Sequence, residues 1–232
     1  MTFTPSPSPR LRVLVTHLGF SMLLVAGLAF WVLTRWYPGG LLGIQGGVPV
    51  MLWVIAITVI IGPLLTLILF RPEKKGRREL LFDLTLIVAI QLGAFGYGAW
   101  VLSVQRPVYL TFLYDRFFLI TPQDVLGAVP AEVQAIPPWS NGPRPVFVKL
   151  SLGAQLEAAT TVYGLDEAPP MALLPGAYAP LSEGRPRFQQ LLESSETKSA
   201  AGNNLLHVPV VGRAGKAQAV IDASSGELLR IE

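Results

Sequence analysis

Three long apolar runs occupy the first 104 residues of the chain. They cover Val13–Leu33, Val48–Phe70 and Leu80–Val104. Each is long enough for a helix to cross a hydrocarbon core, which needs about 20 residues. After residue 104 the apolar positions come in short groups between polar, Gly and Pro residues. The pattern therefore predicts three transmembrane helices followed by a domain outside the hydrocarbon core.

The basic residues predict which side each segment faces. The linker Arg71–Glu79 carries five Lys/Arg, and Arg10 and Arg12 precede the first run. The loop Pro38–Gly47 has none. Because short cytoplasmic loops are enriched in Lys and Arg, the pattern places the N-terminus in the cytoplasm and everything after Gln105 outside it.

The last part of the chain has the pattern of a small α+β domain. Val108–Thr121 is one long strand or a hairpin that turns near Asp115-Arg116. Further strands are expected at Val146–Leu152, Leu205–Val211, Lys216–Asp222 and Glu227–Ile231, and helices at Gln155–Tyr163 and Phe188–Lys198. Pro209 favours an edge position for its strand, because proline donates no ladder hydrogen bond.

We therefore expect an α+β membrane protein with three parts. Residues 1–12 form a cytoplasmic tail, and residues 13–104 form a three-helix transmembrane domain. Residues 105–232 form an extracytoplasmic domain with an antiparallel β-sheet and one or two helices.

The charge and residue counts exclude several function classes. Residues 1–104 hold eight Lys/Arg and three Asp/Glu, whereas residues 105–232 hold ten and twelve. The basic excess thus belongs to the membrane half, where topology accounts for it, and nucleic-acid binding is not expected. The chain has no Cys, and neither His17 nor His207 has a ligand at zinc-motif spacing, so no metal or other cofactor is expected. Both histidines are interpreted as structural.

Polar residues within the second and third runs are the candidates for interactions inside the membrane. Gly62-Pro63 predicts a kink in the second helix, and Thr66 can bond to a nearby helix carbonyl. Asp83 and Gln91 share one face of the third helix. Asp83 lies near the basic linker, and Gln91 is expected to bond to another helix, because one acid does not make a proton pathway.

Several landmarks together resemble one known family. They are Trp36-Tyr37-Pro38, Gly62-Pro63-Leu64-Leu65-Thr66, a basic linker, Asp83-Leu84, Gln91, Tyr97-Gly98, Arg106-Pro107-Val108-Tyr109 and Asp115-Arg116-Phe117. This order resembles the TfpX/TfpZ family of type IV pilin accessory proteins from about Trp36 to Phe118, and again over Gln218–Ile231. In the family an acid usually lies four residues before the Gly-Pro, where this chain has Thr58.

The resemblance implies an inner-membrane factor, not an enzyme, that binds and stabilises a cognate major pilin and promotes pilus assembly. The implied partners are that pilin, the lipid bilayer and other pilus-assembly proteins. The residues implied in interaction or structure are Gly62, Pro63, Thr66, Asp83, Gln91, Tyr97, Arg106, Tyr109, Asp115 and Arg116. Two alternatives stay open: a membrane enzyme that modifies pilin or lipid, and an envelope sensor or transporter subunit.

Overall fold

The computed structural model describes residues 8–71, 76–149, 170–194 and 204–232. It divides the chain into two compact units. Met1–Trp31 and Val48–Ser103 form the first, here called the membrane unit. Val32–Gly47 and Val104–Glu232 form the second, here called the sheet unit. The sheet unit is thus assembled from two separate stretches of chain.

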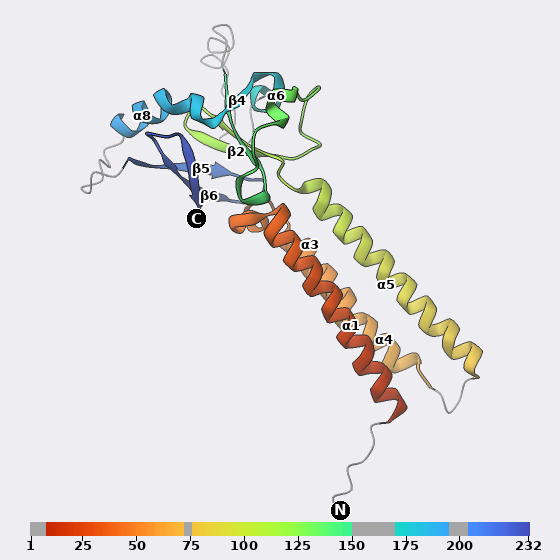
Figure 1. Cartoon of the computed structure of the whole chain (residues 1–232). Helices are drawn as coiled ribbons and strands as arrows, with labels where there is room; N and C mark the ends of the chain where they lie inside the picture. Colours follow the sequence, from red (N-terminus) through yellow and green to blue (C-terminus); the bar gives the residue numbers. More distant parts are fainter. Residues whose placement is uncertain (1–7, 72–75, 150–169, 195–203) are drawn as a thin grey trace, which may run out of the picture. The chain divides into compact units, whose positions relative to one another are not determined.

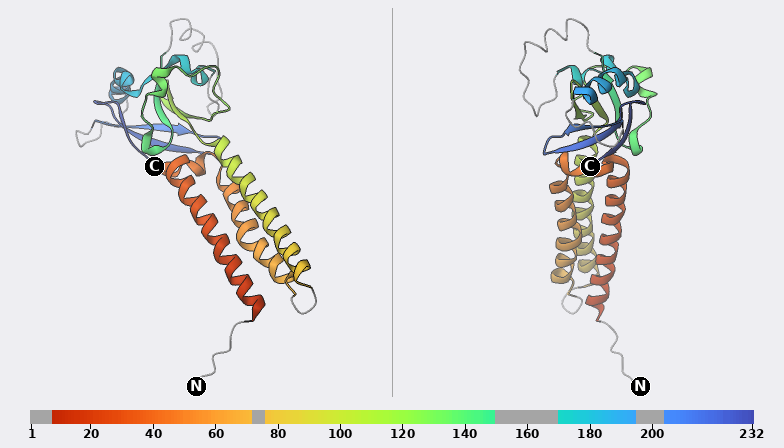
Figure 2. Two further views of the ribbon diagram at one scale, coloured as in Figure 1. Left: turned by 45° about the vertical axis from the view of Figure 1, so that its right-hand side comes forward. Right: turned by 90° about the vertical axis from the view of Figure 1, so that its left-hand side faces the viewer.

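Helices make up the membrane unit. They are α1 (Pro9–Trp31), α3 (Val48–Ile55), the π-helical turn η3 (Ala56–Ile61), α4 (Gly62–Leu69) and α5 (Arg77–Gln105). Within the described residues, three continuous helical stretches are long and apolar enough to span a membrane: Arg10–Trp36, Val48–Leu69 and Arg77–Gln105. They run side by side (Figure 1, Figure 2). The three predicted apolar helices are confirmed, each within a few residues of the predicted bounds.

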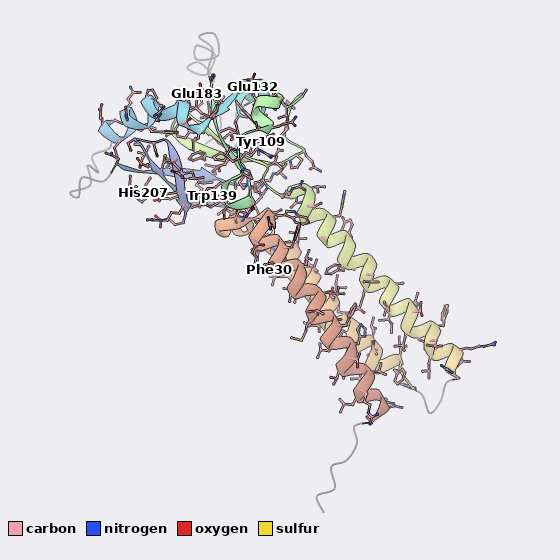
Figure 3. The ribbon with its side chains drawn as sticks, viewed as in Figure 1. Phe30, Tyr109, Glu132, Trp139, Glu183 and His207 are labelled. Atoms are coloured by element: carbon pink, nitrogen blue, oxygen red, sulfur yellow. The ribbon has the colours of Figure 1, made fainter. Side chains whose placement is uncertain are left out.

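The outer surface of this bundle is apolar. Phe30 is 70% exposed and projects from α1 in Figure 3. Trp53 of α3 and Phe82 of α5 are 68% and 69% exposed. Large apolar side chains at this exposure would be costly in water but suit a hydrocarbon environment. The chain is therefore an α+β membrane protein.

Among the described residues, seven strands form one sheet in the order β4-β3-β1-β2-β5-β6-β7. The strands are β1 (Tyr109–Leu113), β2 (Arg116–Ile120), β3 (Arg144–Val148), β4 (Tyr178–Pro180), β5 (Leu205–Val211), β6 (Lys216–Asp222) and β7 (Glu227–Ile231). The β1–β2 hairpin occupies the centre, and β5, β6 and β7 follow as the predicted meander.

The central hairpin is buried on both faces. Phe112 packs edge-on against Phe188 of α8 (Arg185–Ser194), with ring centroids 4.8 Å apart. Tyr109 lies on the opposite face against Tyr178, at 5.2 Å. That second face is closed by α6 (Ala131–Gln134) and the 3-10 turn η5 (Pro170–Leu173). Figure 1 shows α8 and α6 against the sheet. A strand buried on both faces is expected to be almost continuously apolar, as β1 and β2 are apart from Thr111 and Arg116.

Two expectations about the sheet are wrong. The sheet is mixed instead of antiparallel throughout, because β3 pairs parallel with β1 and β5 pairs parallel with β2. Consequently β5 is an interior strand, although it contains Pro209. The proline is tolerated because β5 pairs with β2 only at Val210 and Val211, so the ladder ends before Pro209 needs to donate.

The predicted helix at Gln155–Tyr163 lies outside the described residues. The predicted helix at Phe188–Lys198 corresponds to α8, which begins three residues earlier, at Arg185. Val146–Leu152 corresponds to β3. The alternatives for Val108–Thr121 resolve to the hairpin, whose turn is Tyr114-Asp115.

The segment after α1 belongs to the sheet unit. It comprises the π-helical turn η1 (Val32–Trp36), the 3-10 turn η2 (Pro38–Gly40) and α2 (Leu41–Ile44). Tyr37 is 1% exposed, and burial raises the pKa of its phenol, partly offset by Arg106 and Arg213. Ala214 donates its N–H to the Ile44 carbonyl at 2.8 Å. Gly39 has a φ of +63° and lies against the Trp139 ring, a position that only glycine fills without strain.

Candidate functional site

A cluster of hydrogen-bonded polar groups lies inside the membrane unit, and its geometry begins at Pro63. The preceding turn is π-helical, so the Gly62 N–H donates to the Ile57 carbonyl, five residues back. The next donor in that register would be residue 63, but proline has no N–H. The carbonyl of Thr58 therefore has no backbone donor. Gln91 of α5 fills the position: its Nε2 donates to Thr58 O at 2.9 Å.

Gly62 makes this approach possible. A Cβ built on Gly62 would lie 1.6 Å from Gln91 Nε2 and 2.1 Å from its Cδ. Any other residue would displace the amide, because a real Cβ essentially never lies within 3.0 Å of a non-bonded heavy atom. Gly62 and Pro63 thus serve one purpose together: the proline frees a carbonyl, and the glycine leaves room for the side chain that binds it.

The bond to Thr58 also fixes the hydrogen bonds of His17. A carbonyl oxygen can only accept, so Gln91 must present its amide nitrogen to Thr58 and its Oε1 to His17 Nε2, 2.6 Å away. Because Oε1 is an acceptor, His17 Nε2 carries a hydrogen. The imidazole tautomer on α1 is therefore set by the proline kink in the neighbouring helix.

Thr66 completes the cluster on the other side of the imidazole. Its Oγ1 lies 2.7 Å from His17 Nδ1 and 3.1 Å from the Gly62 carbonyl. When His17 is neutral, the hydroxyl donates to Nδ1. When His17 is protonated, Nδ1–H donates to Oγ1, and the hydroxyl proton turns to the Gly62 carbonyl. Both ring nitrogens of His17 therefore have a hydrogen-bond partner, whichever of Nδ1 and Thr66 Oγ1 is the donor.

A small pocket adjoins the cluster. Its volume is about 50 Å³, and its polar lining comes from His17, Ser21, Thr58 and Gln91. Its apolar lining comes from Phe20, Leu24, Val88, Leu92 and Phe95. Thr58 is 2% exposed, and its Oγ1 has no hydrogen-bond partner among the described residues. The pocket is large enough for one or two water molecules or a carboxyl group.

Four of the residues nominated from the sequence meet in this cluster: Gly62, Pro63, Thr66 and Gln91. Asp83 and Tyr97 share α5 but lie apart from it. Asp83 precedes Gln91 by eight residues, about 12 Å along the helix, and is grouped with Arg78 and Glu79. Tyr97 is 66% exposed and packs on Trp100 with ring centroids 5.7 Å apart.

The other nominated residues lie in the sheet unit. The guanidinium of Arg106 lies over the Trp36 ring, 5.9 Å from its centroid. Tyr109 is in the interior (Figure 3), where burial raises the pKa of its phenol. Asp115 and Arg116 form an ion pair of 2.8 Å at the hairpin turn. These contacts lie within the sheet unit, and none belongs to a pocket of the membrane unit.

Sequence reasoning missed His17 and Thr58. His17 was interpreted as a lone structural histidine, although an ionisable group within a span is a functional candidate by default. Its partners Thr66 and Gln91 lie 49 and 74 residues away, so no motif spacing reveals them. Thr58, the position where the resemblance leads one to expect an acid, lines the same pocket as His17. A carboxylate there would thus adjoin the imidazole.

Comparison with known proteins links the chain to fimbrial assembly. A fimbrial assembly protein of serogroups C1 and C2 from Dichelobacter nodosus is 39% identical over 103 residues, and the match covers 44% of this chain and 76% of that protein. This chain belongs to the family of those fimbrial assembly proteins.

Two further fimbrial assembly proteins of Dichelobacter nodosus match over similar stretches. The serogroup I protein is 40% identical over 103 residues, and the serogroup E1 protein is 38% identical over 104. These matches cover 44% and 45% of this chain but only 38% and 39% of those two proteins. No family model and no solved structure matches the chain.

The described residues contain no group of three or more His, Asp or Glu side chains that could hold a metal ion. The names of the related fimbrial assembly proteins describe assembly instead of a reaction. The cluster of His17, Thr66 and Gln91 is the most interconnected polar arrangement in the described membrane unit, and hydrogen bonding is the chemistry it offers.

Proposed function

We propose that this protein is an accessory factor of type IV pilus assembly, similar to the TfpX/TfpZ proteins, that holds a major pilin in the inner membrane. The observation that carries the proposal is its membership of the fimbrial assembly family. It acts by binding, with its N-terminus in the cytoplasm and the sheet unit in the periplasm. The basic linker between the second and third helices supports that orientation.

The membrane unit supports helix binding in a further way. Gly93 and Gly96 are exposed on α5, and nothing lies within 4 Å of a Cβ built on either. Ala89 is exposed on the same helix, four residues before Gly93. Small residues let a second helix approach closely, and close packing drives helix association in lipid. This surface of α5 therefore suits the membrane helix of a client.

The test is a clean deletion of this gene in a host that keeps its neighbouring pilin gene. Total pilin and surface pilin are measured by quantitative immunoblotting, and pilin transcript is measured in parallel. If the factor protects pilin, both pilin pools fall while transcript is unchanged, and the wild-type gene restores them. A fall in surface pilin alone would indicate that the protein acts at a later step of pilus assembly. Unchanged pilin in both pools would overturn the proposal.

Variants connect the test to the structure. Gly93→Leu and Gly96→Leu block the small-residue surface of α5 without touching the polar cluster, so we expect reduced pilin at normal levels of this protein. Leu81→Ala is the matched control, because Leu81 is 55% exposed near the start of the same helix. Full pilin levels in both glycine variants would exclude this surface as the binding site.

A further inference from the structure

The pocket beside His17 is mostly apolar, but it contains an unpartnered hydrogen-bond donor. Thr58 Oγ1 is buried and without a partner among the described residues, so its proton is free to be donated. Gln91 Nε2 has a second hydrogen besides the one it gives to Thr58 O. The Ser21 hydroxyl also lines the pocket and is 2% exposed. A pocket with an unsatisfied buried hydroxyl is suited to a ligand that accepts hydrogen bonds.

The hydrogen-bond geometry of His17 and the positions of the acids indicate which acceptor the pocket takes. His17 keeps both hydrogen bonds when it is protonated, because the Thr66 hydroxyl then turns to the Gly62 carbonyl. The spans Arg10–Trp36 and Val48–Leu69 contain no acidic residue. The acids of the third span, Glu79 and Asp83, are near its start, and neither lines the pocket. The described part of the unit therefore supplies no carboxylate to neutralise an imidazolium here.

The depth of the pocket indicates how such an acceptor arrives. Thr58 lies ten residues inside its span, about 15 Å along the helix and near the middle of a hydrocarbon core about 30 Å thick. Dissolved anions and lipid headgroups do not reside at that depth, because charge is costly there. A side chain on a transmembrane helix, in contrast, is held at that depth by the helix itself. The mouth of the pocket is flanked by exposed apolar residues, Phe20 of α1 and Val88 and Leu92 of α5.

We propose that this pocket binds the carboxyl group of an acidic side chain on a transmembrane helix of a partner protein. The inference deepens the proposed function, on which it rests, by naming the chemical group through which a membrane client is recognised. Thr58 and Gln91 donate hydrogen bonds to the carboxyl oxygens, and His17 supplies the opposite charge. Pairing removes the cost that an isolated carboxylate and an isolated imidazolium would each carry in hydrocarbon.

The experiment measures binding of designed helices to the full-length protein in nanodiscs of phosphatidylethanolamine and phosphatidylglycerol. The probes are single-span Leu/Ala peptides with one Glu or one Gln at mid-membrane depth, and association is read by fluorescence energy transfer. We expect the Glu peptide to bind at least about fivefold more tightly than the Gln peptide.

Two substitutions identify the pocket as the source of that preference. Thr58→Val keeps the side-chain shape and removes the free hydroxyl, and we expect it to reduce the Glu-over-Gln preference at least about threefold. The unbound variant should unfold at the same or a higher temperature, because an unpartnered buried hydroxyl is lost. Thr85→Val, at an exposed threonine of α5, is the matched control and should leave the preference unchanged.

Three results would overturn the inference. Equal binding of both peptides, or binding of neither, would show that the pocket holds water only. A Thr58→Val protein that keeps the full preference would place the carboxyl group elsewhere. A Thr58→Val protein that unfolds at a clearly lower temperature would make the hydroxyl structural. The pilin deletion test is independent: pilin loss combined with equal peptide binding would reject this inference and leave the proposed function intact.

Discussion

Gln91 of α5 donates its Nε2–H to the carbonyl oxygen of Thr58, 2.9 Å away, in the helical stretch formed by α3, η3 and α4. The bond replaces a backbone donor that Pro63 cannot supply. In lipid no water is present to satisfy a freed carbonyl, so a side chain from a neighbouring helix takes that place. The kink and the glutamine are therefore two halves of one interhelical contact.

Substitution of Gly62 should disrupt this contact. Gly62→Ala places a methyl group where the Gln91 amide lies, so we expect the free energy of unfolding to fall by about 1–3 kcal/mol. Gly96→Ala is the control, because nothing lies within 4 Å of its Cβ, and it should be neutral or stabilising by up to about 1 kcal/mol. Thermal unfolding of the full chain in detergent distinguishes the two. Equal effects of both substitutions would contradict the close approach.

Pro63 and Gln91 should be energetically coupled. Pro63→Ala restores an N–H to the helix, which can satisfy a nearby carbonyl without the glutamine. Gln91→Leu should therefore cost less in the Pro63→Ala background than in the wild type. A double-mutant cycle from unfolding measurements should give an interaction free energy of about 0.5 kcal/mol or more. Strict additivity of the two substitutions would show that the glutamine does not compensate for the proline.

The ion pair at the hairpin turn should contribute little to stability. Asp115 is 50% exposed and Arg116 is 23% exposed, so solvent screens their interaction. We expect Asp115→Asn to change the free energy of unfolding by no more than about 0.5 kcal/mol. Fluorescence-detected unfolding of the sheet unit in the full chain checks this. A loss well above about 1 kcal/mol would assign the pair a larger role than its exposure suggests.

Two buried tyrosines should make the sheet unit sensitive to alkali. Burial raises the pKa of Tyr37 and Tyr178, and the Tyr178 hydroxyl donates to the Ala172 carbonyl. An unfolded tyrosine ionises near its ordinary value of about 10, whereas these two stay neutral in the folded protein. Their contribution is therefore fully present below about pH 10 and is lost as pH rises through the raised values.

Phenolate absorbance and unfolding followed together test this expectation. The phenols of Tyr37 and Tyr178 should ionise only as the sheet unit unfolds. Tyr37→Phe and Tyr178→Phe should each reduce the fall in stability above about pH 10. Ionisation of all tyrosines before unfolding would contradict the burial of these two.

Local patterns in the sequence were sufficient for elements that depend on near neighbours. The last three strands have the predicted bounds, because alternating apolar positions and Gly-containing turns define them locally. They are Leu205–Val211, Lys216–Asp222 and Glu227–Ile231. The three membrane spans follow from the length and composition of the apolar runs. The parallel pairings of β3 and β5 were not predictable, since they join strands far apart in the chain.

The candidate site was only half predictable for a related reason. Pro63 and Gln91 are conspicuous in apolar runs, so they were nominated. The role of His17 depends on how α1 is rotated against α4 and α5, and the helical period of one helix carries no information about its neighbours. Its hydrogen-bond partners are therefore visible only once the three helices are placed together.

The origin of the sheet unit in two chain segments has a consequence for its biosynthesis. Val32–Gly47 leaves the ribosome early, but the 56 residues 48–103 must follow before any strand exists to receive it. The side chains of Val32, Tyr37 and Leu41 cannot be buried in the sheet unit until the next two helices have been inserted. A secreted fragment that begins at Val104 would lack these side chains. It would expose the apolar surface that they cover in the complete sheet unit. Folding of the sheet unit is thus tied to completion of membrane insertion, so a half-inserted chain cannot present a finished sheet.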